Sequence, residues 1–257
     1  MDARRKVLIT GAAGRIGTAF RERYGDRYDL RLVDRNRVPE PGEHEHCVED
    51  LVSLDSALRV CEGVDTVIHL AADPSPRATF YDTLLPLNVQ MTYNMFHAAV
   101  AQKCRRLIFA SSIHAVNAYP LDYQIHPADP VLPGDLYGVT KCWGEALCAY
   151  YGSREGLSCI AIRIGAFGTP ERLAECNDSR LLSLWVSHDD LSQLIHRCIE
   201  AADDVRFLIV QGVSDNQLKR MDISNARELL GYAPQDNAFA YSSHTSLLPR
   251  KPNDSDV

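Results

Sequence analysis

The sequence Lys6-Val-Leu-Ile-Thr10-Gly-Ala-Ala-Gly14-Arg-Ile-Gly17 decides the fold. Its first five residues form an apolar, β-branched run that stops at a glycine, which predicts a buried strand. The three glycines permit a tight turn and a close backbone approach just before a helix begins. A second apolar run at residues 30–34 follows an amphipathic segment that contains Phe20 and Tyr24. Together these pieces predict a strand–helix–strand unit with parallel strands.

Further apolar runs extend this unit into a larger sheet. They predict strands at residues 66–70, 106–110, 159–163 and 207–211. Helical periodicity separates them and predicts helices at residues 53–61, 83–102, 135–153, 189–201 and 222–230. Strands of this kind belong in a parallel sheet that is covered on both faces. The predicted fold class is therefore α/β, a doubly wound (Rossmann) sheet with a small C-terminal substrate-binding region.

The chain is expected to form one nucleotide-binding domain over residues 1–241. Segments 119–134 and 166–187 are rich in proline, glycine and polar residues, which predicts loops over the carboxyl edge of the sheet, where ligands bind. Substrate-binding insertions are expected near 166–187 and 212–237. Residues 242–257 are expected to be a polar tail.

Composition excludes several classes of protein. The chain is 46% hydrophobic and 24% charged, and no apolar run approaches the roughly 20 residues of a membrane span. We expect a cytoplasmic protein without a signal peptide or membrane partner. The net charge of −7 argues against a nucleic-acid partner. Eight cysteines without a Cys-x-x-Cys pair predict reduced thiols and no bound metal.

The glycine loop predicts a dinucleotide site, because free N–H groups at a helix N-terminus bind pyrophosphate. Asp34 ends the second strand about 20 residues later, where a carboxylate binds the adenosine ribose and repels a 2′-phosphate. NAD is therefore the predicted cofactor. Arg35 and Arg37 leave NADP as the alternative, because an arginine can hold that phosphate. Glu49-Asp50-Leu51, after the third strand, either places a carboxylate near the adenine amine or is an exposed loop.

Tyr137-Gly-Val-Thr-Lys141 places a phenol and an ammonium on one face of a helix. Tyrosine, with a pKa of about 10, is a poor base at neutral pH. A lysine one turn away, with a positive nicotinamide nearby, stabilises the phenolate so that it can take a proton from a substrate hydroxyl. Ser112, at the end of strand five, can hydrogen-bond the same oxygen. A surface pair on an amphipathic helix is the alternative interpretation.

Residues 6–237 resemble the extended branch of the short-chain dehydrogenase/reductase superfamily, the NAD-dependent epimerase/dehydratase-like family. The resemblance rests on the glycine loop, His69 to Ala72, Asn88, Phe109 to Ser112, the Tyr/Lys motif and Arg163-Ile-Gly165. Within that branch, the segment from Arg180 to Asp190 is similar to uronate dehydrogenases. The chain is equally similar to archaeal NAD-dependent glucose-6-phosphate dehydrogenases through Asp73-Pro74, Val213 to Asn216, and Gly231 to Asn237.

This resemblance implies that Ser112, Tyr137 and Lys141 are the catalytic triad. The substrate contacts that we expect are Ser75, Ser112, His114, Tyr137 and Arg180. The cofactor contacts that we expect are Gly11, Gly14, Arg15, Ile16, Gly17, Asp34, Asp50, Leu51, Leu70, Ala71, Ala72, Asn88, Tyr137, Lys141 and Ile164. Arg180 suits a carboxylate or phosphate through a two-pronged contact, or is a solvated loop arginine. His188 is expected at a helix start, outside the site.

Three positions depart from these relatives. Ile113 replaces an asparagine found in both, Ala166 replaces a serine of the uronate enzymes, and Ser75 replaces an arginine of the sugar-phosphate enzymes. We expect an NAD-dependent oxidoreductase that oxidises C1 of a small, acidic sugar, a uronate first, to the lactone. A sugar-phosphate dehydrogenase, a nucleotide-sugar epimerase or dehydratase, and a non-catalytic dinucleotide sensor are the alternatives. The expected partners are a sugar and further copies of the chain in a homo-oligomer.

Overall fold

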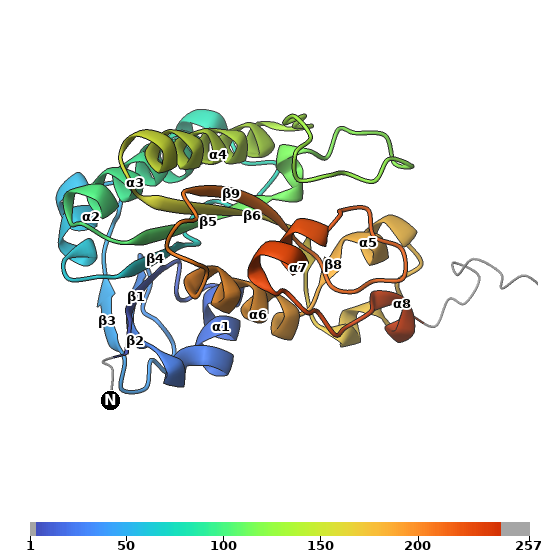
Figure 1. Ribbon diagram of the computed structural model, residues 1–257, viewed down its shortest axis with the longest axis horizontal. Helices are drawn as coiled ribbons and strands as arrows, with labels where there is room; N and C mark the ends of the chain where they lie inside the picture. The colour runs from blue at the N-terminus through green and yellow to red at the C-terminus, as the bar shows by residue number, and fades with distance from the viewer. Residues whose placement is uncertain (1–3, 243–257) are drawn as a thin grey trace, which may run out of the picture.

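The computed structural model describes residues 4–242, which build a seven-stranded parallel sheet between two layers of helices (Figure 1). The strand order is β3-β2-β1-β4-β5-β6-β9, so the chain reverses its direction of growth between β1 and β4. The strands are β1 (Lys6–Thr10), β2 (Asp29–Asp34), β3 (Glu45–Val48), β4 (Thr66–His69), β5 (Arg106–Ser112), β6 (Ser158–Ile164) and β9 (Phe207–Gly212). The predicted doubly wound α/β class is confirmed.

Helices cover both faces of the sheet. One layer contains α2 (Leu54–Cys61), α3 (Met91–Ala101) and α4 (Leu136–Arg154). The other contains α1 (Arg15–Tyr24), α6 (His188–Ile199) and α7 (Ser224–Leu230). Strand residues alternate between two hydrophobic cores: Val7 and Ile9 pack with α1 and α6, whereas Leu8 packs with the other layer. The middle of β1, β5 and β6 is a continuous apolar run (Val7–Ile9, Leu107–Ala110 and Cys159–Ile162), because both faces of these strands are buried.

Two features of the first half differ from the sequence prediction. The edge strand β3 carries no apolar run, because three of its four residues are exposed. The helix predicted at 83–102 begins at Phe80, and its first part, Phe80–Gln90, is π-helical around Pro86. Proline lacks an N–H group and its ring crowds the preceding turn, so a wider turn accommodates it.

The segment 166–187 is more ordered than the loop predicted for it. β7 (Ala166–Phe167) pairs in parallel with β8 (Trp185–Val186), and α5 (Ser179–Leu184) lies between them. Leu182 and Trp185 pack in a separate small core with Ala238 and Phe239 of α8 (Ala238–Tyr241). This burial of apolar side chains orders the segment. The substrate-binding role of 166–187 and 212–237 stays a prediction, and the tail at 243–257 lies outside the described residues.

A buried ion pair joins α4 to the sheet beneath its carboxyl edge. Arg163 of β6 donates from Nε and Nη2 to the two carboxylate oxygens of Glu145, each at 2.9 Å. The two side chains are 1% and 4% exposed. Ser111 of β5 donates its hydroxyl to Glu145 Oε1 at 2.5 Å. One carboxylate therefore ties two central strands to one helix.

We expect Glu145→Ala to lower the free energy of unfolding by about 3–5 kcal/mol, because it leaves the Arg163 charge buried without a partner. Urea unfolding of both proteins measures this difference. Arg59→Ala is the control, since Arg59 pairs with Glu49 at the surface and its loss should cost about 1 kcal/mol or less. Equal losses at the two positions would show that the buried pair contributes no more than a surface pair.

Candidate active site

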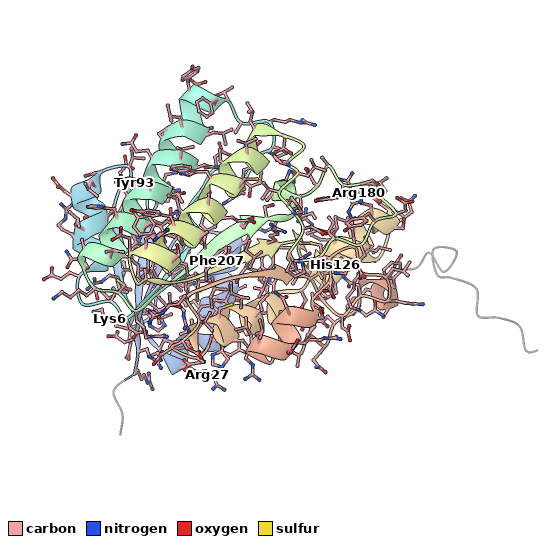
Figure 2. All side chains as sticks on the ribbon, turned by 45° about the horizontal axis from the view of Figure 1, so that its top comes forward. Lys6, Arg27, Tyr93, His126, Arg180 and Phe207 are labelled. Atoms are coloured by element: carbon pink, nitrogen blue, oxygen red, sulfur yellow. The ribbon has the colours of Figure 1, made fainter. Side chains whose placement is uncertain are left out.

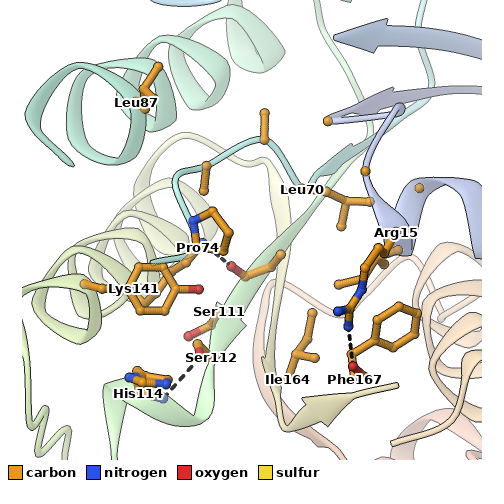
Figure 3. A pocket seen from close by; sticks show the side chains of 18 of the residues that line it. Arg15, Leu70, Pro74, Leu87, Ser111, Ser112, His114, Lys141, Ile164 and Phe167 are labelled. Carbon is orange, nitrogen blue, oxygen red and sulfur yellow. Dashed lines mark hydrogen bonds between the residues drawn. The ribbon is translucent and has the colours of Figure 1, made fainter. Parts of the chain in front are cut away.

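A cavity of about 780 Å³ opens where the strand order reverses, at the carboxyl edge of the sheet. Its walls come from the glycine loop, the ends of β2, β4, β5 and β6, and the first turns of α4 and α5. Ser112, His114 and Lys141 lie on one side, and Arg15, Ile164 and Phe167 lie on the other (Figure 3). Every predicted site residue except Asn88 and Ser75 lines this cavity.

The glycine loop fits a bound pyrophosphate. Gly11 has φ +70°, and a Cβ there would lie 2.8 Å from the backbone nitrogen of Ala71. A Cβ at Gly17 would lie 2.9 Å from the Cα of Ala12, so this glycine lets α1 begin directly against the loop. Gly14 caps α1 without a side-chain hydrogen bond. The first N–H groups of α1 thus face the cavity with no side-chain acceptor, which suits an anion.

Asp34 ties the end of β2 to this loop. Its Oδ2 accepts the Ala13 N–H at 3.1 Å, and its Oδ1 accepts the Asn36 N–H at 2.9 Å. Arg35 also lines the cavity, whereas Arg37 does not. The carboxylate therefore stands where an adenosine ribose would bind, with one arginine beside it.

Asn88 and Ser75 do not line the cavity, and their contacts with cofactor and substrate stay predictions. Asn88 is 2% exposed, and its amide holds the backbone N–H and C=O of Asp73 at 2.8 and 3.0 Å. Its Nδ2 also donates to Thr140 Oγ1 at 3.1 Å. The Ser75 N–H donates to the Asp73 carboxylate. Both residues shape the Asp73 turn, from which Pro74 reaches the cavity.

Two of the three predicted catalytic residues, Tyr137 and Lys141, lie on the first turns of α4, and the third, Ser112, ends β5. Asp135 caps this helix by accepting the Gly138 N–H at 2.8 Å. A Cβ at Gly138 would lie 2.2 Å from the His114 carbonyl oxygen, so only glycine permits this approach of α4 to the end of β5. Lys141 Nζ donates to the Ala110 carbonyl at 2.8 Å and lies 5.4 Å from the centre of the Tyr137 ring.

Burial controls the charge states of this pair. It raises the pKa of Tyr137 to about 12, and the negative charges of Asp135 and Asp73 add to the rise, while a hydrogen bond with Ser112 opposes it. Burial lowers the pKa of Lys141 to about 8. At neutral pH Lys141 is therefore mostly charged and Tyr137 is a phenol. The phenolate needs a further positive charge nearby.

Arg180 and Arg220 interact electrostatically, but of the two only Arg180 lines the cavity. Arg180 lines the cavity, far from Lys6 at the start of β1 (Figure 2). Within residues 4–242 its guanidinium forms no ion pair or hydrogen bond, which favours an external anion as its partner. Arg220, which the sequence analysis missed, is 5% exposed, and its Nε and Nη1 have no partner among residues 4–242. Burial, followed by the charge of Arg180, lowers the pKa of Arg220.

A second contact that the sequence did not reveal joins the glycine loop to β7. Arg15 donates to the carbonyl oxygen of Phe167, and its guanidinium lies 5.4 Å from the centre of that ring. The Phe167 ring stacks on His188 at 4.4 Å. His188 begins α6, as expected, but it stands directly behind a residue of the cavity wall. The pairing depends on tertiary contacts between segments about 150 residues apart, so no local pattern predicts it.

The sequence analysis expects neither a bound metal nor a membrane span. Residues 4–242 contain no cluster of histidine, cysteine, aspartate or glutamate that could hold a metal ion. No helix in that same range is long and apolar enough to cross a membrane.

The comparison with protein families decides what kind of protein carries this site. Residues 7–204 match the model of the NAD dependent epimerase/dehydratase family. The chain belongs to this family. It is an NAD-dependent oxidoreductase of the extended short-chain dehydrogenase/reductase type.

Individual members of this epimerase/dehydratase family are similar over nearly the whole chain. The NAD-dependent glucose-6-phosphate dehydrogenase of Haloferax volcanii is 36% identical over 92% of this chain and 95% of its own length. The uronate dehydrogenase of Pseudomonas putida is 35% identical over 95% of this chain and 89% of its own length. A solved structure of a mutant uronate dehydrogenase from Agrobacterium tumefaciens, complexed with NAD, is 34% identical and has a TM-score of 0.84. The match covers 98% of this chain and 93% of that one.

We expect a preference for NAD over NADP of about 100-fold or more in kcat/KM, because the Asp34 carboxylate repels a 2′-phosphate by about 2.7 kcal/mol or more. Asp34→Asn should reduce this ratio at least tenfold. Arg35→Ala should weaken the residual use of NADP, whereas Arg37→Ala, outside the cavity, should leave the ratio unchanged. A ratio that Asp34→Asn does not alter would remove Asp34 as the discriminating group.

Proposed function

We propose that this protein oxidises C1 of a small, acidic, cyclic sugar to the lactone, with NAD as hydride acceptor. The observation that carries the proposal is the placement of Tyr137, Lys141 and Ser112 in the same cavity as Arg180. The first three suit the oxidation of a hydroxyl group, and the fourth is a cation that has no ion-pair partner within residues 4–242. Relatives named as uronate and glucose-6-phosphate dehydrogenases support a sugar substrate with an acidic group.

The chain's own residues would carry the proton and hold the substrate oxygen. Tyr137, as phenolate, takes the proton of the C1 hydroxyl, and Ser112 donates a hydrogen bond to the same oxygen as its carbonyl forms. Lys141 supplies the positive charge that stabilises the phenolate. NAD, when bound, supplies the acceptor for the C1 hydride and a positive ring near the phenol. The hydroxyl oxygen thus loses its proton, C1 loses its hydrogen as a hydride, and the C1–O bond becomes the lactone carbonyl.

The two arginines support an anionic substrate. A buried cation without a counter-ion is costly, and Arg220 also faces the like charge of Arg180. A carboxylate or phosphate at the Arg180 end would offset both penalties, since a guanidinium binds either group through two parallel hydrogen bonds. Ile113 and Ala166 leave the rest of the cavity less polar than in the uronate enzymes. A uronate remains the first choice and a sugar phosphate the second.

Product analysis tests the reaction. With NAD and a panel of uronates, aldoses and sugar phosphates, we expect the NMR spectrum to show a lactone that forms in step with NADH. Tyr137→Phe should lower kcat by more than about 100-fold while NAD binding persists, because it removes the proton acceptor and keeps the ring. A 4-keto sugar or a C4 epimer as the product would instead identify a dehydratase or an epimerase.

Arg180→Ala should raise KM for the acidic sugar about 10- to 100-fold, the value of one charge-assisted contact, and leave KM for the neutral aldose nearly unchanged. Arg180→Lys is the matched control, because it keeps the charge and loses the two-pronged geometry. The change in KM is measured for a uronate against its aldose and for glucose 6-phosphate against glucose. The two comparisons show whether Arg180 binds a carboxylate or a phosphate. An equal rise in KM for acidic and neutral sugars would show that Arg180 is not the anion contact.

A further inference from the structure

His114 and Asp135 form a pair beside the catalytic tyrosine that the reaction above does not use. His114 Nδ1 lies 2.6 Å from Asp135 Oδ2, and the two side chains are partly buried, with 30% and 22% of their surface exposed. The His114 ring meets the Tyr137 ring edge-on, with 5.3 Å between ring centres. His114 lines the cavity, whereas Asp135 does not. Asp135 can thus reach a ligand only through the histidine.

The charge of Asp135 fixes the direction of this hydrogen bond. Burial alone would raise the pKa of Asp135, but hydrogen bonds from the Gly138 N–H and from His114 bring it below the usual value. An ionised carboxylate only accepts hydrogen bonds, so His114 Nδ1 must carry the hydrogen. Asn117 does not offer another acceptor, because its Oδ1 already accepts the Gly134 N–H at 2.7 Å and its Nδ2 is a donor.

The opposite ring nitrogen then has a defined role. In a neutral imidazole with hydrogen on Nδ1, Nε2 is an acceptor only. Within residues 4–242, no hydrogen bond to His114 Nε2 is formed. An acceptor without a partner in a cavity wall favours a hydrogen-bond donor on the ligand. On an acidic sugar that donor is a hydroxyl group, because the ionised acidic group only accepts hydrogen bonds.

We propose that Asp135 is a positioning residue that holds His114 in the Nδ1–H tautomer, so that Nε2 accepts a hydrogen bond from a sugar hydroxyl beside Tyr137. The sugar is taken from the proposed function, whereas the tautomer is a property of the protein alone. The pair and Arg180 then orient the substrate together: a hydroxyl faces His114, and the anion faces Arg180.

Asp135→Asn isolates this effect. Asparagine caps a helix as well as aspartate does, so its Oδ1 can still accept the Gly138 N–H and keep α4 in place. Its Nδ2 would donate to His114 Nδ1, which moves the histidine hydrogen to Nε2 and turns the acceptor into a donor. We expect kcat/KM for the sugar to fall about 10- to 100-fold while the Kd for NAD stays within about twofold.

Nitrogen-15 NMR of histidine-labelled protein reads the tautomer without any sugar, and His114→Gln assigns the signal. Hydrogen on Nδ1 in the wild-type protein and on Nε2 in Asp135→Asn is the expected result. Hydrogen on Nε2 in the wild-type protein would overturn the proposal, whatever the substrate is. A failure to oxidise any sugar would contradict the proposed function alone, and the assignment of the His114 tautomer would still stand.

A double-mutant cycle closes the test. In the His114→Gln background, Asp135→Asn should change kcat/KM by less than about twofold, because its effect passes through the histidine. The same loss in both backgrounds would show that Asp135 acts on α4 and not on His114. A flipped tautomer with unchanged kcat/KM in the single variant would show that Nε2 does not accept from the sugar.

Discussion

The close contact of α4 with β5 is the constraint on which the site depends. Two glycines on one face of the helix permit it: a Cβ at Gly138 would meet the His114 carbonyl, and a Cβ at Gly144 would lie 2.1 Å from the Phe109 ring. Lys141 lies between them on that same face and reaches the Ala110 carbonyl. The approach therefore removes Lys141 from water, which is the physical cause of its lowered pKa. The same close packing of α4 against β5 thus holds the helix in place and sets the pKa of Lys141.

The charges of the site are not balanced by the protein itself. Tyr137 is a phenol at neutral pH, and burial raises its pKa further, while the guanidinium of Arg220 is only partly hydrogen-bonded. A positive cofactor ring would favour the phenolate, and an anionic sugar would offset the arginines. The protein without ligands thus lacks one charge of each sign: a positive charge near Tyr137 and a negative charge near Arg180. This pattern fits a site that becomes complete only with both ligands present.

The parts of the site that the sequence predicts are those with local signatures. The glycine loop, Asp34 and the Tyr137–Lys141 spacing each depend on a strand end or one helix turn, and all of them line the cavity. Strand and helix bounds differ mostly by one or two residues, except at the exposed edge strand and at the π-helix. The contact of Arg15 with Phe167 and the proximity of Arg220 to Arg180 were not predicted, because tertiary packing alone brings these residues together. The homo-oligomer and the cytoplasmic location remain predictions.

The contact of Arg15 with Phe167 links the glycine loop to the segment 166–187. Arg15 belongs to the loop that is predicted to bind the cofactor, and Phe167 belongs to the segment that is predicted to bind the substrate. A shift of this contact would move residues of both predicted sites, which gives the two binding free energies a route by which to couple. Such coupling is reciprocal: any affinity that the sugar gains from a bound cofactor through this link, the cofactor gains equally from a bound sugar.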